Sequence, residues 1–244
     1  MHKLDRSSVI EPTCLAEYSY PDQTWDDFSG PCKRSVRLAL QQIQGQQVDS
    51  DDTDDEAEYI LGLRCAYCES QIFFGGHIEN FRRKNPAHFP ELTFSWANLF
   101  LACESKDHCG HYKDKGCSNY NPDELIKPDE HDSDDYLYFH SSGDVRVRNQ
   151  PQLSEADQRR AKETIRVFNL NFGELQGKRR RAAKAYMDKN TNIIEELMAW
   201  DQQEREKYIH MEIEATRWDP FATTIKHFLR NHLPPHHAPL PSRG

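Results

Sequence analysis

The sequence predicts an α+β fold in which a small core with short strands lies between mainly helical segments. Apolar runs at 60–64 and 72–74 are typical of short strands, and the alternation at 136–148 around a Ser-Gly pair indicates a β-hairpin. Apolar residues at helical spacing occur instead toward both ends of the chain. Strands wrapped by helices at both ends make an α+β arrangement.

Residues 1–59 are expected to form a helical and irregular segment that ends in an acidic linker. Prolines and glycine break residues 1–34, and the pattern that follows Ser35 predicts a helix that Gly45 ends. Residues 49–58 hold seven acids and no base, which is typical of a solvated linker because like charges repel one another. The apolar face of the predicted helix is formed by Val36, Ala39, Leu40 and Ile43.

We expect the core at 60–150, a C-terminal helical region at 151–232 and a flexible tail at 233–244. Asn121 and Pro122 form a helix start, and the capping-box residues at 154–157 open another helix. The last thirteen residues hold four prolines and three histidines, so we expect them to be loose. The C-terminal helices are predicted at 154–169, 174–218 and 223–231.

Composition narrows the class of protein. No apolar stretch approaches the ~20 residues of a membrane span, and the N-terminus lacks the apolar core of a secretory signal. The cysteine count of seven is odd, which argues against a secreted disulfide framework. We therefore expect a cytoplasmic protein with no membrane contact, in which the cysteines are reduced. Cys14 and Cys32 are expected to be ordinary thiols.

Two cysteine pairs predict a metal site. Cysteines three positions apart can bind one ion from a tight knuckle, and a closed tetrahedral site needs a second pair. Hydrophobic residues make up only 36% of the chain, so bound metal is expected to help stabilise a thin core. The predicted ligands of a structural zinc (Zn) ion are Cys65, Cys68, Cys103 and Cys109. Cys117 or His108 can take the place of Cys109 in this assignment.

Polar residues between the two pairs are candidates for chemistry. His77 and Glu79 share a face if their segment is a strand. Hydrolysis of a phosphodiester needs a base, a cation that stabilises charge and a rigid frame. A lone histidine is more often an ordinary hydrogen-bonded residue, and a lone acid is often a surface group. The position of His77 between the cysteine pairs, beside Gly75 and Gly76, favours a catalytic role.

This stretch resembles the HNH (ββα-metal) endonucleases, and more narrowly the PtuB-like HNH subunit of Septu anti-phage systems, some of which accompany retrons. The likeness covers about residues 60–185. Asn121-Pro122, the hairpin at 138–147 and the 164–175 stretch also match. The main matching motifs are Arg64-Cys65-Ala66-Tyr67-Cys68-Glu69, His77-Ile78-Glu79-Asn80-Phe81-Arg82, Trp96-Ala97-Asn98-Leu99-Phe100-Leu101-Ala102-Cys103, and Cys109 with Lys113.

The resemblance implies a role for each site residue. His77 would be the general base, and Asn98 would tie a loop to the strand and orient that base. His111 and Glu79 would hold a catalytic Mg or Mn ion. Family members read acidic–His–aromatic where this chain has Glu79, Asn80 and Phe81, so a second alignment places Asn80 at the base position.

The basic residues Arg82, Arg83 and Lys84 would contact backbone phosphates without reading sequence. DNA is the expected substrate, and RNA, including tRNA, fits the same chemistry. The net charge of −9 does not exclude a nucleic acid, because local fields matter more than total charge. Basic runs on helices, including 178–181, are also often solvated faces.

The resemblance also implies partners. Septu nucleases work with a PtuA-like ABC/SMC-type ATPase, and a retron reverse transcriptase with its RNA/DNA can accompany them. The chain has no phosphate-binding G-x-x-x-x-G-K-[ST] loop of its own, which agrees with an ATPase partner. Two alternatives remain open from the sequence. One is a zinc-stapled interaction module without catalysis, and the other is a thiol oxidoreductase that uses Cys65 and Cys68.

Overall fold

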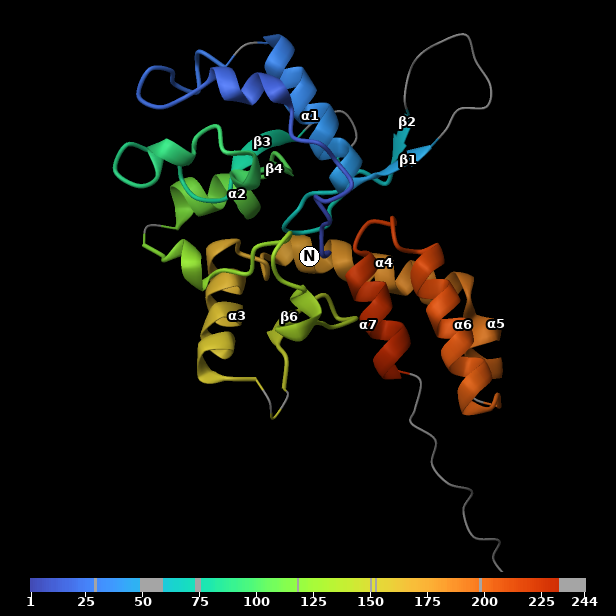
Figure 1. The fold of residues 1–244 in the computed structure, drawn as a ribbon. Coiled ribbons are helices and arrows are strands. Elements are labelled where there is room, and N and C mark those ends of the chain that lie inside the picture. The colour runs from blue at the N-terminus through green and yellow to red at the C-terminus, as the bar shows by residue number, and fades with distance from the viewer. Residues whose placement is uncertain are drawn as a thin grey trace, which may run out of the picture.

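The expected α+β class is confirmed by the computed structural model, which combines helices with three two-stranded antiparallel sheets in the part of the chain it describes (Figure 1). The described residues are 1–28, 30–48, 59–72, 76–117, 119–149, 151, 153–197 and 199–232. The strands are β1 Gln46–Val48, β2 Tyr59–Leu61, β3 His77–Asn80, β4 Leu99–Ala102, β5 Leu137–Phe139 and β6 Val145–Val147. The helices are α1 Gly30–Gln44, α2 Cys109–His111, α3 Glu155–Val167, α4 Gly173–Lys189, α5 Thr191–Leu197, α6 Gln202–Ala215 and α7 Ala222–His232.

The sheet of β3 and β4 lies at the centre of the core. His77 of β3 pairs with Ala102 of β4 in antiparallel register, and all four residues of β4 are buried. Helix α1 packs against β4, where the side-chain amide of Gln44 donates to Leu101 O at 2.9 Å and its oxygen accepts from Leu101 N at 2.7 Å. A buried amide that is satisfied in this way fixes the helix against the strand without a polar penalty.

The expected hairpin and helix starts are confirmed. Strands β5 and β6 pair antiparallel, with Leu137 opposite Val147. The side chain of Ser154 caps α3 by accepting from Asp157 N. Asn121 caps a short 3-10 helix, Pro122–Glu124, by accepting from Asp123 N.

Helix α1 and the C-terminal region differ from the sequence expectation. Helix α1 begins at Gly30 rather than Ser35, because Pro31 is compatible with the first turn of a helix. The single helix expected over 174–218 is three helices, since α6 has its own N-cap at Asp201, which accepts from Glu204 N. The acidic linker at 49–58, the predicted strand residues 73–74 and the tail at 233–244 lie outside the described residues.

Cys14 and Cys32 form a disulfide, so the expectation that they are free thiols is wrong. Cys14 belongs to the 3-10 helix Thr13–Glu17, and Cys32 lies in the first turn of α1. These two elements bring the Cα atoms to 5.8 Å, a separation that suits a disulfide. Sequence spacing alone did not indicate this contact.

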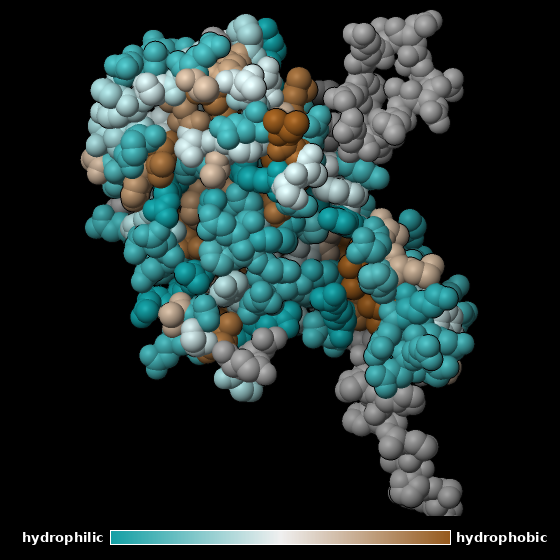
Figure 2. Space-filling model, viewed as in Figure 1, coloured by the Kyte–Doolittle hydropathy of each residue, from teal (hydrophilic) through white to brown (hydrophobic). Residues whose placement is uncertain are grey.

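Helices α4 to α7 form a C-terminal layer on one side of the core (Figure 1). Helix α7 contacts α4, α6 and the hairpin strand β5. Figure 2 shows a largely hydrophilic face with several hydrophobic patches, one of them a strip near the position of α7. Among the described helices, none is both long enough and apolar enough to cross a membrane.

Candidate metal centre

Four cysteine side chains converge at one end of the β3–β4 sheet. Their sulfur atoms all lie within 4.8 Å of one another, and together they form a group that could hold a metal ion such as zinc. Three of the side chains are buried and that of Cys103 is half-buried. The group consists of the four predicted residues, Cys65, Cys68, Cys103 and Cys109.

Local backbone geometry explains why these cysteines meet. Cys65 N donates to Ser70 O at 2.9 Å, and Ser70 N donates to Cys68 Sγ at 3.4 Å, which closes a tight knuckle. Ala66 N donates to Leu101 O at 3.0 Å and fastens this knuckle to β4. Strand β4 then leads directly into Cys103, which places the second pair beside the first.

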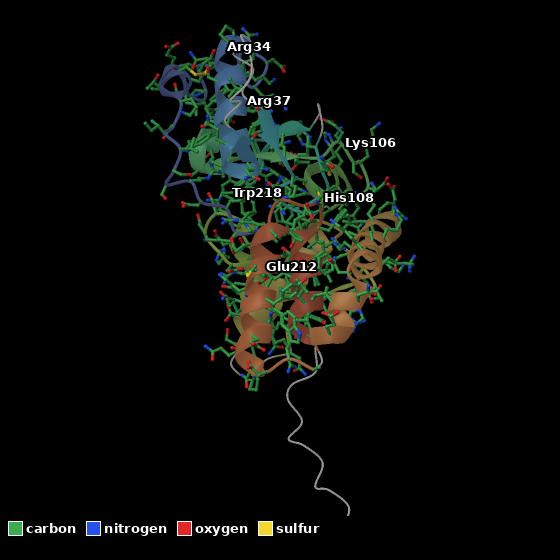
Figure 3. The ribbon with its side chains drawn as sticks, turned by 90° about the vertical axis from the view of Figure 1, so that its right-hand side faces the viewer. Arg34, Arg37, Lys106, His108, Glu212 and Trp218 are labelled. Carbon is green, nitrogen blue, oxygen red and sulfur yellow. A yellow bond between two sulfur atoms is a disulfide. The ribbon has the colours of Figure 1, made fainter. Side chains whose placement is uncertain are left out.

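The structure also distinguishes the alternatives for the fourth ligand. Cys117 lies elsewhere, where its sulfur accepts from Arg166 Nη1 at 3.2 Å. His108 is buried, and its Nδ1 lies 3.1 Å from Cys109 Sγ and 3.7 Å from Cys103 Sγ. Figure 3 shows His108 where the core meets the start of α4. Burial alone would lower the pKa of His108, but its hydrogen bonds to Cys103 and Cys68 raise it to about 9. His108 therefore lies against the sulfur group, which consists of the four cysteines alone.

A second group of possible metal ligands lies beside the cysteines. His77, Glu104 and His111 each bring one donor atom within 4.8 Å of the others, and these residues are half-buried or exposed. Glu104 Oε1 lies 3.6 Å from His77 Nδ1, and Glu104 Oε2 lies 3.3 Å from His111 Nε2. The two imidazole rings stack with their centroids 4.1 Å apart. Two imidazoles and a carboxylate at an accessible position can bind a divalent cation.

Glu104 is the residue that sequence reasoning missed. It directly follows Cys103, at the end of β4, and His77 is paired with Ala102 across the sheet. The position of Glu104, next to the predicted zinc ligand Cys103, could have indicated it. The same stretch of backbone that places Cys103 in the sulfur group places Glu104 beside His77.

Glu79, the expected metal carboxylate, is held by two protein cations. Its Oε2 lies 2.9 Å from His77 Nε2, and its Oε1 lies 2.8 Å from Nζ of the fully buried Lys113. Burial would raise the pKa of Glu79, but the charge of Lys113 and the hydrogen bond with His77 lower it to about 2. Gly110 makes this approach possible, because a Cβ there would lie 2.5 Å from Glu79 Oε2. Glu79 is thus an ionised group that fixes His77.

This contact determines the orientation of His77. An ionised Glu79 accepts a hydrogen bond from His77 Nε2, so Nδ1 faces Glu104. Burial would lower the pKa of His77, but the hydrogen bond and charge of Glu79, with the charge of Glu104, raise it. The His77 ring is therefore held in one orientation, with Nδ1 directed toward Glu104.

The two asparagines of the predicted motif have different surroundings. Asn98 accepts from Arg82 N at 2.7 Å and donates to Arg82 O and Leu92 O, each at 3.0 Å, so it closes the loop between β3 and β4. Asn80 is buried and donates to Thr93 O at 2.9 Å. Because alternate residues of a strand face opposite sides, Asn80 lies on the other face of β3 from His77. The second ligand group contains His77 and not Asn80.

The basic run after β3 is largely engaged within the protein. Arg82 pairs with Asp123, and Arg83 donates to the carbonyl oxygens of Lys113 and Cys117. Lys84 lies over the Trp25 ring, with Nζ 4.6 Å from its centroid. The structure thus separates these three residues, which the sequence places together, into three environments.

Comparisons with known proteins add no family. A scan against protein-family models finds no match to this chain, and a search of curated proteins finds none either.

Proposed function

We propose that this protein is a divalent-cation-dependent HNH endonuclease that hydrolyses phosphodiester bonds in nucleic acid. The observation that carries the proposal is the group formed by His77, Glu104 and His111 beside the four-cysteine cluster. The four cysteines are suited to hold the fold together, and the second ligand group is accessible to a substrate. The resemblance of residues 60–185 to HNH endonucleases supports the same reaction class.

The side chains divide the work of this reaction. His111 and Glu104 would hold Mg²⁺ or Mn²⁺, which when bound stabilises charge on the phosphate and the leaving oxygen. His77, with Nε2 occupied by Glu79, has Nδ1 available to accept a proton from the attacking water. Glu79 positions that base and does not ligate the cation in this scheme, because Lys113 occupies its other oxygen.

Cleavage assays test the proposal directly. We expect the zinc-loaded protein to cut plasmid DNA, or failing that single-stranded DNA or tRNA, when Mg²⁺ or Mn²⁺ is added. His77→Ala and His111→Ala are each expected to lower the rate by about 10²–10⁴. His210→Ala, an exposed histidine on α6, is the matched control and should cut at the wild-type rate. Absence of His77-dependent cutting of every substrate with both cations would overturn the proposal.

A second candidate is a zinc-stapled interaction module without catalysis. The observation that favours it is the surroundings of the acidic–Asn pair of β3, since Glu79 is neutralised by Lys113 and Asn80 is bonded to Thr93 O. On this reading both side chains are engaged within the protein and neither acts on a substrate. A protein that binds zinc, cuts nothing and still assembles with a partner would fit this candidate and not the first.

We propose that the nuclease is the effector subunit of an ATPase-coupled anti-phage complex, and that the second candidate would be an interaction module of such a complex. The expected partner is a PtuA-like ABC/SMC-type ATPase, with the layer of α4 to α7 as the docking region. Purification of the tagged full chain from its native cells, followed by mass spectrometry, tests this assembly. Recovery of the chain alone would count against it.

A further inference from the structure

A cavity of about 490 Å³ lies between the N-terminal segment around Trp25 and the loop that follows β3. Figure 1 shows these two segments next to each other at one edge of the core, the first in blue and the second in green. The volume is in the range of small-ligand sites. We propose that this cavity binds a nucleotide unit, with the base against Tyr20 and the phosphate at Lys84.

The aromatic wall of the cavity is preorganised for stacking. Trp25 packs against Phe28, with ring centroids 5.1 Å apart, and lies nearly parallel to Phe94 at 6.3 Å. Tyr20 also lines the cavity and keeps 41% of its surface exposed. Since Phe28, Phe94 and Lys84 pack on the Trp25 ring, the exposed phenol of Tyr20 is the surface offered to a base, and stacking of this kind tolerates any base.

The cationic wall points to an anion. Lys84 lines the cavity, and its Nζ lies 4.6 Å from the centroid of the Trp25 ring. Lys84 is half-buried, and burial lowers the pKa of its ammonium group. Among the described residues Lys84 forms no ion pair within 4.0 Å, while the nearby charges of Glu79 and Asp114 partly oppose the effect of burial on its pKa. An ammonium group at the wall of a cavity that forms no direct ion pair is placed to bind a phosphate.

The acidic residues of the lining do not oppose this assignment. Asp114 is already compensated, because its Oδ1 lies 2.7 Å from Lys113 Nζ and 3.5 Å from Arg83 Nε. Asp26 is exposed at the rim, where its carboxylate can accept a hydrogen bond from an exocyclic amino group of a base.

The cavity is joined to the candidate metal centre by a short chain of ion pairs. Asp114 contacts Lys113, which contacts Glu79, which in turn holds His77. A ligand that contacts Asp114 would therefore touch the same charged network that orients the base of the proposed reaction. The binding proposal itself requires no cleavage, so its failure and the failure of the proposed function are distinguishable.

Binding is measured on the full zinc-loaded chain without added divalent cations. The probes are adenosine 5′-monophosphate, adenosine, inorganic phosphate and a fluorescent ten-nucleotide oligothymidine, followed by calorimetry or fluorescence anisotropy. We expect Lys84→Gln to weaken binding by about tenfold to a hundredfold. Tyr20→Ala is expected to weaken it by about fivefold or more. Lys207→Gln, an exposed lysine on α6, is the matched control and should bind as wild type.

The probes also distinguish the source of the nucleotide. Tight binding of the oligonucleotide with weak binding of the monophosphate would assign the cavity to one unit of a single strand. Equal binding per nucleotide would assign it to a free nucleotide. The proposal is overturned if neither adenosine 5′-monophosphate nor the oligonucleotide binds with Kd below about 1 mM. It is also overturned if phosphate alone binds as tightly as the monophosphate, or if Lys84→Gln has no effect on binding.

Discussion

The two ligand groups of this core share the same elements but differ in donors and in exposure. Strand β4 is followed by Cys103 and then Glu104, and α2 carries both Cys109 and His111. Neighbouring residues thus supply sulfur to a mostly buried group and nitrogen or oxygen to an accessible one. The comparison teaches how one short segment can supply residues to a buried group and to an accessible group of possible ligands.

We expect the second ligand group to depend on the sulfur group, but not the reverse. Soft thiolates that enclose an ion make a structural site, whereas imidazoles and a carboxylate open to solvent leave positions for water or substrate. Loss of the sulfur group would release both ends of the turn that carries Glu104 and His111. Loss of the second group would leave the sulfur group intact.

The largest expected effect is on the sulfur group. Cys68→Ser should remove most of the zinc affinity, and structural zinc contributes roughly 10 kcal/mol in small metal-held units. Because this is comparable to the whole free energy of unfolding of a typical domain, we expect the core of Cys68→Ser to unfold. Circular dichroism and zinc content measure this. Cys117→Ser, outside the group, should stay folded. The comparison breaks if Cys68→Ser keeps wild-type stability while His111→Ala unfolds the chain.

A smaller effect is expected behind the second group. Lys113→Met leaves the buried Glu79 without its ammonium partner, and removal of one member of a buried pair costs about 3–5 kcal/mol. Denaturant unfolding measures this loss. The double variant with Glu79→Gln should recover part of it, since no buried charge then remains uncompensated. Wild-type stability of Lys113→Met would show that the pair does not support the site.

The smallest effect is expected at an ion pair that lies outside both ligand groups. Asp134 accepts from His227 Nε2 at 3.0 Å and pairs with Lys226, which joins α7 to the hairpin region. Burial would raise the pKa of Asp134, but His227 and Lys226 lower it. Because the pKa of Asp134 is lower in the folded state, its ionised form stabilises the folded state at pH values above the ordinary pKa of about 4. This stabilisation is lost as the pH falls below that value.

Asp134→Asn should therefore lower the free energy of unfolding by about 2 kcal/mol at neutral pH. The difference from wild type should shrink in acid, as followed by denaturant unfolding between neutral pH and about pH 2. Asp22→Asn, an exposed acid, is the control. A difference that stays constant over the whole range would contradict the assignment.

Much of the metal centre was predictable because its signals are local. The spacing of the cysteines gave all four members of the sulfur group, and a two-residue offset placed His77 and Glu79 on one face of β3. The hairpin and the Ser154 cap were predictable for the same reason, since turn residues and caps act over a few positions.

The remaining features depend on contacts between segments distant in the sequence. Lys113 lies far from Glu79 along the chain, and no pattern indicated that its ammonium is fully buried against that carboxylate. The disulfide of Cys14 and Cys32 likewise depends on how two helices meet. Such contacts are decided by packing, which propensity and spacing do not encode.

Metal content with coordination tests the central claim most directly. X-ray absorption and elemental analysis of the protein, with Mn²⁺ added as a second ion, would report both groups at once. We predict one zinc bound by four sulfurs and one Mn²⁺ bound by nitrogen and oxygen, the latter lost in a His111→Ala, Glu104→Gln double variant that keeps its zinc. Zinc without sulfur ligands, or Mn²⁺ binding that this double variant leaves unchanged, would contradict the account.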